Sequence, residues 1–239
     1  MRRNIVEKAS SVKEIVFPIF TNGTLFDEDY MNLFDKNRNL VLIVSIEGNE
    51  YQTDSRRGKN TYNSIMAAVD ILNKRKILFG CSITVTTENI KAVTNKEFVQ
   101  DLYDKGTRVL IFVEYTPVIK STEKLAPTDI ERLLLERSLE KLRQLFENIV
   151  FLSFPGDEKY MGGCLAAGRG FFHINANGSA EPCPLSPYSD VNLKDSSLRE
   201  ALKSPLFKKL KDNEILLGEH TDGCTLFGKE DDVKKFLST

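Results

Sequence analysis

Three of the four cysteines in this 239-residue chain are placed where a thiolate could bind a metal. Thirteen residues separate Cys164 from Gly178, four more separate Gly178 from Cys183, and Cys224 follows near the end of the sequence. Cys164 and Cys183 lie among glycine and proline rather than within apolar runs, and thiolates suit iron–sulfur clusters and zinc. The spacing therefore predicts a metal centre at Cys164, Cys183 and Cys224, with small buried hydrophobic residues as the alternative.

Cys81 and the two histidines are weaker candidates for metal binding. Cys81 lies inside an apolar run, so we expect it to pack in a core. His173 lies in a predicted hairpin, where packing is favoured over a metal role. His220 lies four residues before Cys224 and could supply a fourth ligand, with a solvent-facing loop histidine as the alternative.

Polar residues also follow two predicted strands. Thr21-Asn22-Gly23 comes after the first strand, Ser45-Ile46-Glu47-Gly48 ends the second, and Asp54-Ser55-Arg56-Arg57-Gly58 is expected in the loop beyond it. Ligands of open α/β sheets and barrels bind at the carboxyl ends of the strands. Each segment alone is also typical of a turn, a strand end or a solvated loop, but their order along the chain favours a common ligand site.

The elements that must position these residues alternate between strands and helices, as in consecutive βα units. Nearly continuous apolar runs predict parallel strands covered on both faces, at Ile15–Phe20, Leu40–Ile46, Ile77–Thr86, Arg108–Tyr115 and Ile149–Phe154. Apolar residues at helical spacing predict helices between them, at Asp27–Lys36, Thr61–Lys74, Asn95–Lys105 and Thr128–Phe146. Thr128 and Glu131 have the spacing of a capping box at the start of the last helix.

After about residue 155 the sequence becomes rich in Gly, Cys and Pro, which predicts a second, smaller unit. Phe171–Ile174 and Ser179–Cys183 flank Asn177-Gly178, a pair that tolerates positive φ, and they predict a β-hairpin. An amphipathic helix is predicted over Leu198–Leu210 and a short final helix over Asp231–Leu237.

The composition excludes several classes of protein. With 33 basic and 34 acidic side chains the net charge is -1, so there is no basic excess for binding nucleic acid. No apolar run approaches the roughly 20 residues that cross a bilayer, and the polar N-terminus lacks a secretory signal. We therefore expect a cytoplasmic protein, with no membrane or nucleic-acid partner, whose cysteines stay reduced.

Taken in order, these motifs resemble those of the radical S-adenosylmethionine superfamily, in members with a C-terminal SPASM or twitch extension. Residues 17–25 are similar to the third barrel strand and its TNG turn, and residues 45–48 to the fourth-strand S-x-D-G motif, with Glu47 in place of Asp. Residues 54–58 are similar to the D-x-x-R-G that follows, with Thr53 in place of the usual preceding His. The most specific match is Cys164-x13-Gly178-x4-Cys183, which fits the pattern of an auxiliary cluster.

Two motifs of that superfamily are absent from the sequence, the C-x3-C-x2-C loop and the GGE motif. Residues 1–9 are similar to the helix that follows GGE. The resemblance thus implies an N-terminally truncated α/β protein, with a partial (β/α)6 barrel of about four parallel strands over 1–154 and a SPASM/twitch-like iron–sulfur domain over 155–239. Only three cysteines follow residue 155, which implies a reduced, single-cluster form of the extension.

The resemblance also implies roles for individual residues. Ser45 and Arg57 would help to hold the ribose or carboxylate of S-adenosylmethionine in an intact barrel, and Cys164, Cys183 and Cys224 would hold an auxiliary [4Fe-4S] cluster. Complete relatives generate a 5′-deoxyadenosyl radical, often to modify peptides or proteins, whereas this chain alone is expected to lack that reaction. The alternatives are a non-enzymatic binding or partner protein and a zinc-stabilised α/β domain.

A further expectation concerns the strand at Ile15–Phe20. Without a preceding strand to pair with, its outer edge exposes unpaired N–H and C=O groups, and such an edge is a template for association. We expect self-association, or binding of another polypeptide, at this edge.

Overall fold

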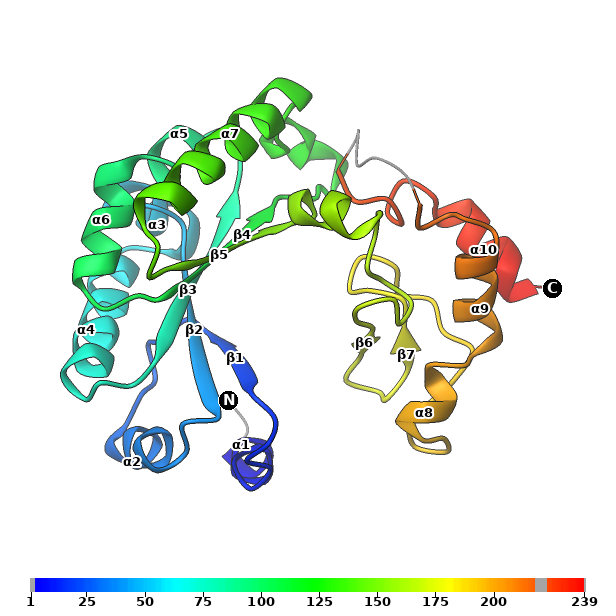
Figure 1. The fold of residues 1–239 in the computed structure, drawn as a ribbon, viewed down its shortest axis with the longest axis horizontal. Coiled ribbons are helices and arrows are strands. Elements are labelled where there is room, and N and C mark those ends of the chain that lie inside the picture. The colour runs from blue at the N-terminus through cyan, green and yellow to red at the C-terminus, as the bar shows by residue number, and fades with distance from the viewer. Residues whose placement is uncertain (1–2, 218–222, 239) are drawn as a thin grey trace. The chain divides into compact units, whose positions relative to one another are not determined.

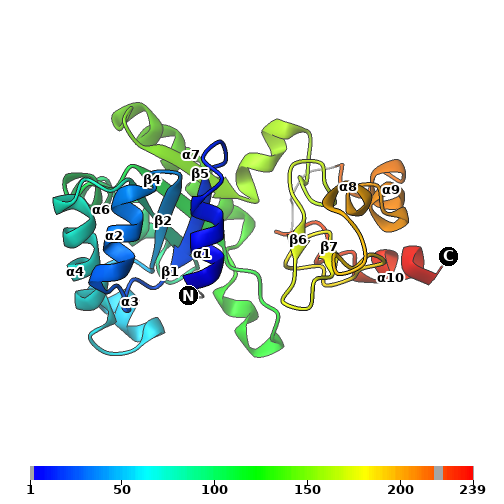
Figure 2. The same ribbon diagram turned by 90° about the horizontal axis from the view of Figure 1, so that it is seen from below.

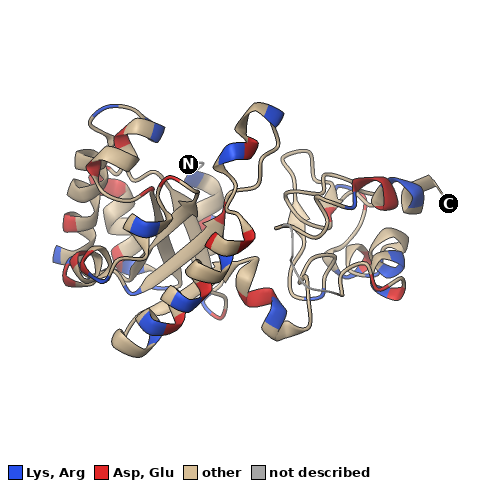
Figure 3. Ribbon diagram, turned by 90° about the horizontal axis from the view of Figure 1, so that it is seen from above, with Lys and Arg blue, Asp and Glu red and all other residues tan. Residues whose placement is uncertain are grey.

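The computed structural model describes residues 3–217 and 223–238, which divide between two compact units, Met1–Phe154 (unit 1) and Pro155–Thr239 (unit 2). Figures 1 and 2 show the elements of each unit. None of the described helices is both long and apolar enough to cross a membrane. Basic and acidic residues are interspersed along the helices (Figure 3), in agreement with the near-neutral net charge.

Unit 1 is built on a parallel sheet in which the strands have the same order in space as in sequence. Its strands are β1 (Phe17–Thr21), β2 (Leu40–Ile46), β3 (Phe79–Val85), β4 (Val109–Glu114) and β5 (Val150–Phe154). All the predicted apolar runs form strands. The sheet therefore has five strands, one more than the four or so expected of the partial barrel.

Most of the helices of unit 1 lie on one side of the curved sheet (Figure 1). The described helices are α1 (Arg3–Ser10), α2 (Glu28–Lys36), α3 (Glu50–Arg57), α4 (Thr61–Lys74), α5 (Ile90–Val93), α6 (Lys96–Asp104), η1 (Lys120–Leu125) and α7 (Asp129–Leu145). The predicted capping box at Thr128 and Glu131 is confirmed. The prediction of a loop over 54–58 was wrong, because a capping box at Asn49 and Gln52 starts α3 and the helix continues to Arg57.

The two faces of the sheet differ in how they are covered. On the helix side, side chains such as Leu42, Cys81 and Phe112 are fully buried. On the other side Ile43 is buried in a small central cluster, whereas Phe20 at one edge is 59% exposed and Val150 at the other is 55% exposed. The expectation of a sheet covered on both faces therefore holds only at its centre, because none of the helices described in unit 1 covers the second face along its edges.

Unit 2 is smaller and richer in loops. Its elements are η2 (Gly156–Met161), β6 (His173–Ile174), β7 (Ala180–Glu181), α8 (Leu198–Ala201), α9 (Pro205–Asp212) and α10 (Glu230–Ser238). The predicted hairpin is confirmed, since β6 and β7 pair antiparallel. The single helix predicted over Leu198–Leu210 is instead divided, because Ser204 caps a new helix and Pro205 has no N–H with which to continue the first.

Candidate functional site

The cysteines predicted to bind a metal all lie in loops of unit 2. Cys164 follows η2, Cys183 follows β7, and Cys224 precedes α10. The first two are buried and Cys224 is partly exposed. Cys81 lies apart from them in β3, fully buried in the core of unit 1, as expected.

Backbone amides are directed at each of these three sulfur atoms. An N–H group a short distance along the chain donates to each thiol, from Ala166 to Cys164, from Leu185 to Cys183, and from Leu226 and Phe227 to Cys224. Hydrogen bonds of this kind stabilise the thiolate form, which is the form that binds metals. In the metal-free chain these hydrogen bonds oppose the effect of burial, which raises the pKa of Cys164 and Cys183.

Two of the thiols are in direct contact. A hydrogen bond between Cys183 and Cys224, together with burial, raises the pKa of Cys183, and the same hydrogen bond lowers the pKa of Cys224 to about 7. Burial raises the pKa of Cys164 to about 12, and the charge of Cys224 acts in the same direction. The hydrogen-bonded pair of Cys183 and Cys224 therefore loses its first proton more readily than Cys164 does.

Arg169 fixes the loop that carries Cys164. Its Nη1 donates to the carbonyl oxygens of Cys164 at 2.7 Å and Leu216 at 3.4 Å, and its Nη2 donates to those of Met161 and Gly162, both at 3.2 Å. The N–H of Cys164 also donates to the carbonyl of Leu216 at 2.8 Å. The Arg169 side chain therefore joins the loop before Cys164 to the backbone at Leu216.

The hairpin holds Cys183 in place at the end of β7. Gly178 has a φ of 88°, and a Cβ there would lie 2.9 Å from Oδ1 of Asn192, so the turn requires glycine. The buried Glu181 accepts hydrogen bonds from Nδ1 of His173 at 2.7 Å and from Nδ2 of Asn175 at 2.5 Å. His173 packs in the hairpin as expected, but its partner Glu181 was missed, although the hairpin register places the two opposite each other.

An unpartnered hydroxyl lies next to Cys183. Ser186 is 1% exposed, its N–H donates to the carbonyl of Cys183 at 3.0 Å, and its Oγ has no hydrogen-bond partner among the described residues. A buried polar group left in this state costs about 1–3 kcal/mol. An acceptor such as a cluster sulfide or a metal-bound thiolate would satisfy it, so the residues present fit a sulfur-rich group.

The same residues do not form a site for a single metal ion. Within residues 3–217 and 223–238, no three His, Cys, Asp or Glu side chains meet in a group that could hold one. His220, the proposed fourth ligand, lies outside the described residues. The ligand roles of Cys164, Cys183 and Cys224 stay a prediction.

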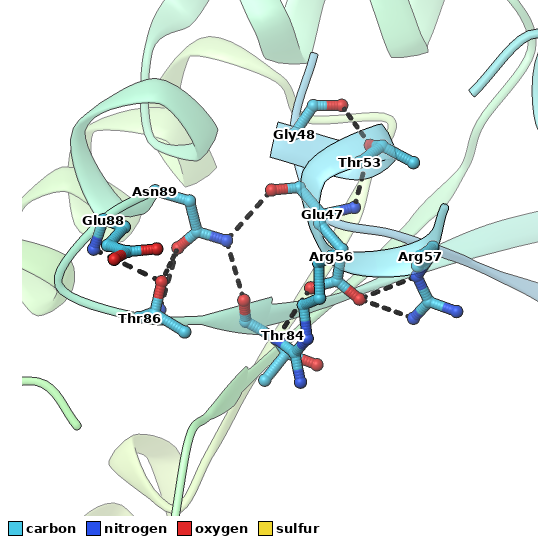
Figure 4. A network of polar contacts seen from close by, with 9 residues as sticks. All are labelled: Glu47, Gly48, Thr53, Arg56, Arg57, Thr84, Thr86, Glu88 and Asn89. Atoms are coloured by element: carbon cyan, nitrogen blue, oxygen red, sulfur yellow. Dashed lines mark hydrogen bonds and ion pairs between the residues drawn. The ribbon is translucent and has the colours of Figure 1, made fainter. Parts of the chain in front are cut away.

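A second polar network lies at the carboxyl end of β2 in unit 1 (Figure 4). The Glu47 side chain is 1% exposed. Its Oε1 accepts hydrogen bonds from Nε and Nη2 of Arg57 at 2.8 and 2.5 Å, and its Oε2 accepts one from Nη1 of Arg56 at 3.0 Å. Two cations thus share one buried carboxylate, and Arg57 remains 26% exposed.

Neighbouring residues fix the backbone around Glu47. Thr53, fully buried, accepts the N–H of Glu47 at 3.3 Å and donates to the carbonyl of Gly48 at 3.2 Å. Asn89 donates to the carbonyl of Glu47 at 2.9 Å and to that of Thr84 at 2.8 Å (Figure 4). The ends of β2 and β3 are therefore held together, and Asn89 is a residue that the sequence did not single out.

Two residues of the segment 54–58 make different contacts. Asp54 accepts the N–H groups of Asn60 at 2.6 Å and Tyr62 at 2.8 Å and so fixes the start of α4. Arg57 instead contacts Glu47. Ser45, the other predicted binding residue, lies one position before the end of β2 and is in register with Ser82 of β3. Ser45 therefore lies at the carboxyl end of β2, and Arg57 is hydrogen-bonded to Glu47 directly beyond that end.

Comparison with known proteins gave sequence relatives but no matching family model. The chain is 23% identical over 240 residues to the cysteine-type anaerobic sulfatase-maturating enzyme of Clostridium novyi (strain NT), a match that covers 89% of this chain and 62% of that enzyme. It is 28% identical over 96 residues to the serine-type enzyme of Klebsiella aerogenes, which covers 38% of this chain and 23% of that enzyme. The chain thus spans less than two thirds of the length of these relatives.

Solved structures share the fold. SuiB of Streptococcus suis matches with a TM-score of 0.72 at 14% identity, covering 87% of this chain and 54% of that one. Native anSMEcpe with bound AdoMet and Cp18Cys peptide matches with a TM-score of 0.67 at 18% identity, covering 94% of this chain and 69% of that one. The α/β architecture described above is therefore shared with these solved structures.

Proposed function

We infer that this chain functions as part of a radical S-adenosylmethionine protein. Its sequence similarity to the sulfatase-maturating enzymes and its fold support this inference. We propose that unit 2 is an auxiliary iron–sulfur domain of the SPASM/twitch type and that unit 1 contributes to an S-adenosylmethionine-binding barrel. The names of the relatives refer to sulfatase maturation, and solved structures contain a precursor peptide or a short peptide. We therefore propose a peptide or protein as the substrate.

The observation that carries this proposal is the arrangement of the thiols in unit 2. Cys183 and Cys224 are in hydrogen-bond contact, Cys164 interacts electrostatically with both, and Ser186 offers an unpartnered hydroxyl beside Cys183. When bound, a [4Fe-4S] cluster would supply one-electron transfer or an iron to which substrate can bind. The three cysteines would hold it as thiolates, and Ser186 would donate a hydrogen bond to a sulfur atom.

In unit 1 we propose that Ser45 and Arg57 contact the ribose or carboxylate of S-adenosylmethionine. Arg57 uses two N–H groups on Glu47 and is partly exposed, so it can present its remaining N–H groups to an anion. The sequence contains no C-x3-C-x2-C motif, so we propose that this chain alone does not cleave S-adenosylmethionine. Because the cluster needs reduced thiols, we propose a cytoplasmic location.

Anaerobic reconstitution with iron and sulfide tests the auxiliary cluster. The wild-type chain should become brown and retain about four irons, and Cys183→Ala should lose most of that iron. Cys81→Ala is the matched control, because Cys81 is equally buried but lies in the core of unit 1. Equal iron in wild type and Cys183→Ala would refute the assignment. A colourless protein containing stoichiometric zinc would favour the zinc-stabilised domain instead, because Zn²⁺ is d¹⁰.

A further inference from the structure

A buried glutamate, Glu158, lies against the cysteine loops of unit 2. It belongs to η2 and is 4% exposed. Its Oε1 accepts the N–H of Leu165 at 3.1 Å, and its carbonyl oxygen accepts the N–H of Gly163 at 3.1 Å. Hydrogen bonds to the residues on both sides of Cys164 therefore fix Glu158 beside this cysteine.

The Glu158 carboxylate interacts with two of the thiols. The thiol of Cys164 hydrogen-bonds to it, and its charge acts on Cys224 as well as on Cys164. As thiolates, the three cysteines and this carboxylate would bring four negative charges into a largely buried space. Such a group is costly unless cations share it, and metal ions bound by these atoms would remove the cost.

Arg169 does not direct its charge at the thiols. It brings one positive charge, but the four hydrogen bonds of its Nη atoms go to carbonyl oxygens rather than to sulfur. It organises the loop that carries Cys164. Iron ions bound by the thiolates and by Glu158 would themselves bring positive charge to this space.

We propose that the Glu158 carboxylate is the fourth protein ligand of the iron–sulfur cluster held by Cys164, Cys183 and Cys224. The inference rests on the proposed function. A four-iron cluster held by three cysteines has one iron without a thiolate, and an oxygen ligand suits that position. Carboxylate is a harder ligand than thiolate, so the iron bound by Glu158 is the one that can exchange its ligand for a substrate atom.

The test compares the reconstituted wild-type chain with Glu158→Gln, Glu158→Cys and His220→Ala, by iron content, EPR and reduction potential after mild oxidation. Glu114→Gln is the matched control, because Glu114 is also a buried carboxylate but lies in β4 of unit 1, where it pairs with Arg132. Each variant is first checked for wild-type circular dichroism. If Glu158→Gln does not fold, Glu158→Cys carries the test, because it restores a ligand.

We expect Glu158→Gln to retain about three irons instead of four and to give the EPR signal of a three-iron cluster. Glu158→Cys should keep four irons with a more negative reduction potential, and Glu114→Gln and His220→Ala should match wild type. A four-iron cluster unchanged in Glu158→Gln, or its conversion to a three-iron cluster in His220→Ala alone, would overturn the inference and leave the proposed cluster standing. A wild-type chain that binds no iron would instead overturn the proposed function itself.

Discussion

The Oε1 atom of Glu47 accepts two hydrogen bonds from a single guanidinium, those of Nε and Nη2 of Arg57. This forked contact fixes the plane of the Arg57 side chain, while Arg56 occupies the other carboxylate oxygen. The orientation of Arg57 at the carboxyl end of β2 therefore depends on a residue two positions beyond Ser45.

The first prediction concerns the stability that this contact provides. Glu47→Gln removes the charge that both arginines share, and we expect the free energy of unfolding to fall by about 1–3 kcal/mol. A larger loss is not expected, because both arginines remain partly exposed and solvated. Urea unfolding measures the effect. The control is Glu50→Gln, an exposed residue of α3, the helix that carries both arginines. Equal midpoints for the two variants would mean that the network adds no stability.

The second prediction concerns thiol reactivity in the metal-free chain. The pKa of Cys224 is lowered to about 7, so its alkylation by iodoacetamide should rise between pH 6 and pH 8 and then level off, because the thiolate is the nucleophile. Burial raises the pKa of Cys81 to about 12, so it should stay unlabelled until the chain unfolds. Peptide mass spectrometry distinguishes the sites. Labelling of Cys81 in the native chain at pH 8 would contradict this expectation.

The third prediction is that S-adenosylmethionine binds this chain weakly. Ser45 and Arg57 supply only part of the proposed site, and the sequence has no C-x3-C-x2-C motif to hold the catalytic cluster. Each missing polar contact costs about 1–3 kcal/mol, so several together move a micromolar ligand to the millimolar range. Titration calorimetry checks this, and low-micromolar affinity would show that the chain contains a more complete site than we propose.

The fourth prediction concerns the edge of the sheet at β1. Among the described strands β1 pairs only with β2, and Val16 and Phe20 are 63% and 59% exposed. We expect concentration-dependent association that Phe20→Lys weakens, because a charge on an edge strand opposes pairing. Light scattering measures it, with Ile130→Lys on α7 as control for an exposed apolar residue elsewhere. A monodisperse 27.1 kDa monomer at high concentration would rule out association through this edge.

Local signals in the sequence were enough to predict most of the fold. The bounds of β2 and α4 agree with the prediction to the residue, because an uninterrupted apolar run and a helical apolar stripe are both local patterns. Pro205 also indicates the division between α8 and α9, whereas the amphipathic pattern around it predicts one continuous helix.

Contacts between distant segments could not be predicted in the same way. The charge of Glu158 acts on Cys224 only once unit 2 has folded, and Arg169 contacts Leu216 across 47 positions. Composition and spacing identify residues able to bind a ligand, but which of them meet depends on loop conformations that no periodic pattern encodes. The cysteines were found because their residue type is rare and their spacing distinctive, whereas glutamate is too common to stand out.

The sequential strand order of unit 1 has a consequence for biosynthesis. Each strand pairs with the one made just before it, so no strand has to wait for a partner encoded much later in the chain. Closing one connection at a time keeps the loop-closure entropy of every step small. The sheet can therefore assemble strand by strand as the polypeptide leaves the ribosome, and the three thiols of unit 2 are synthesised only after its last strand.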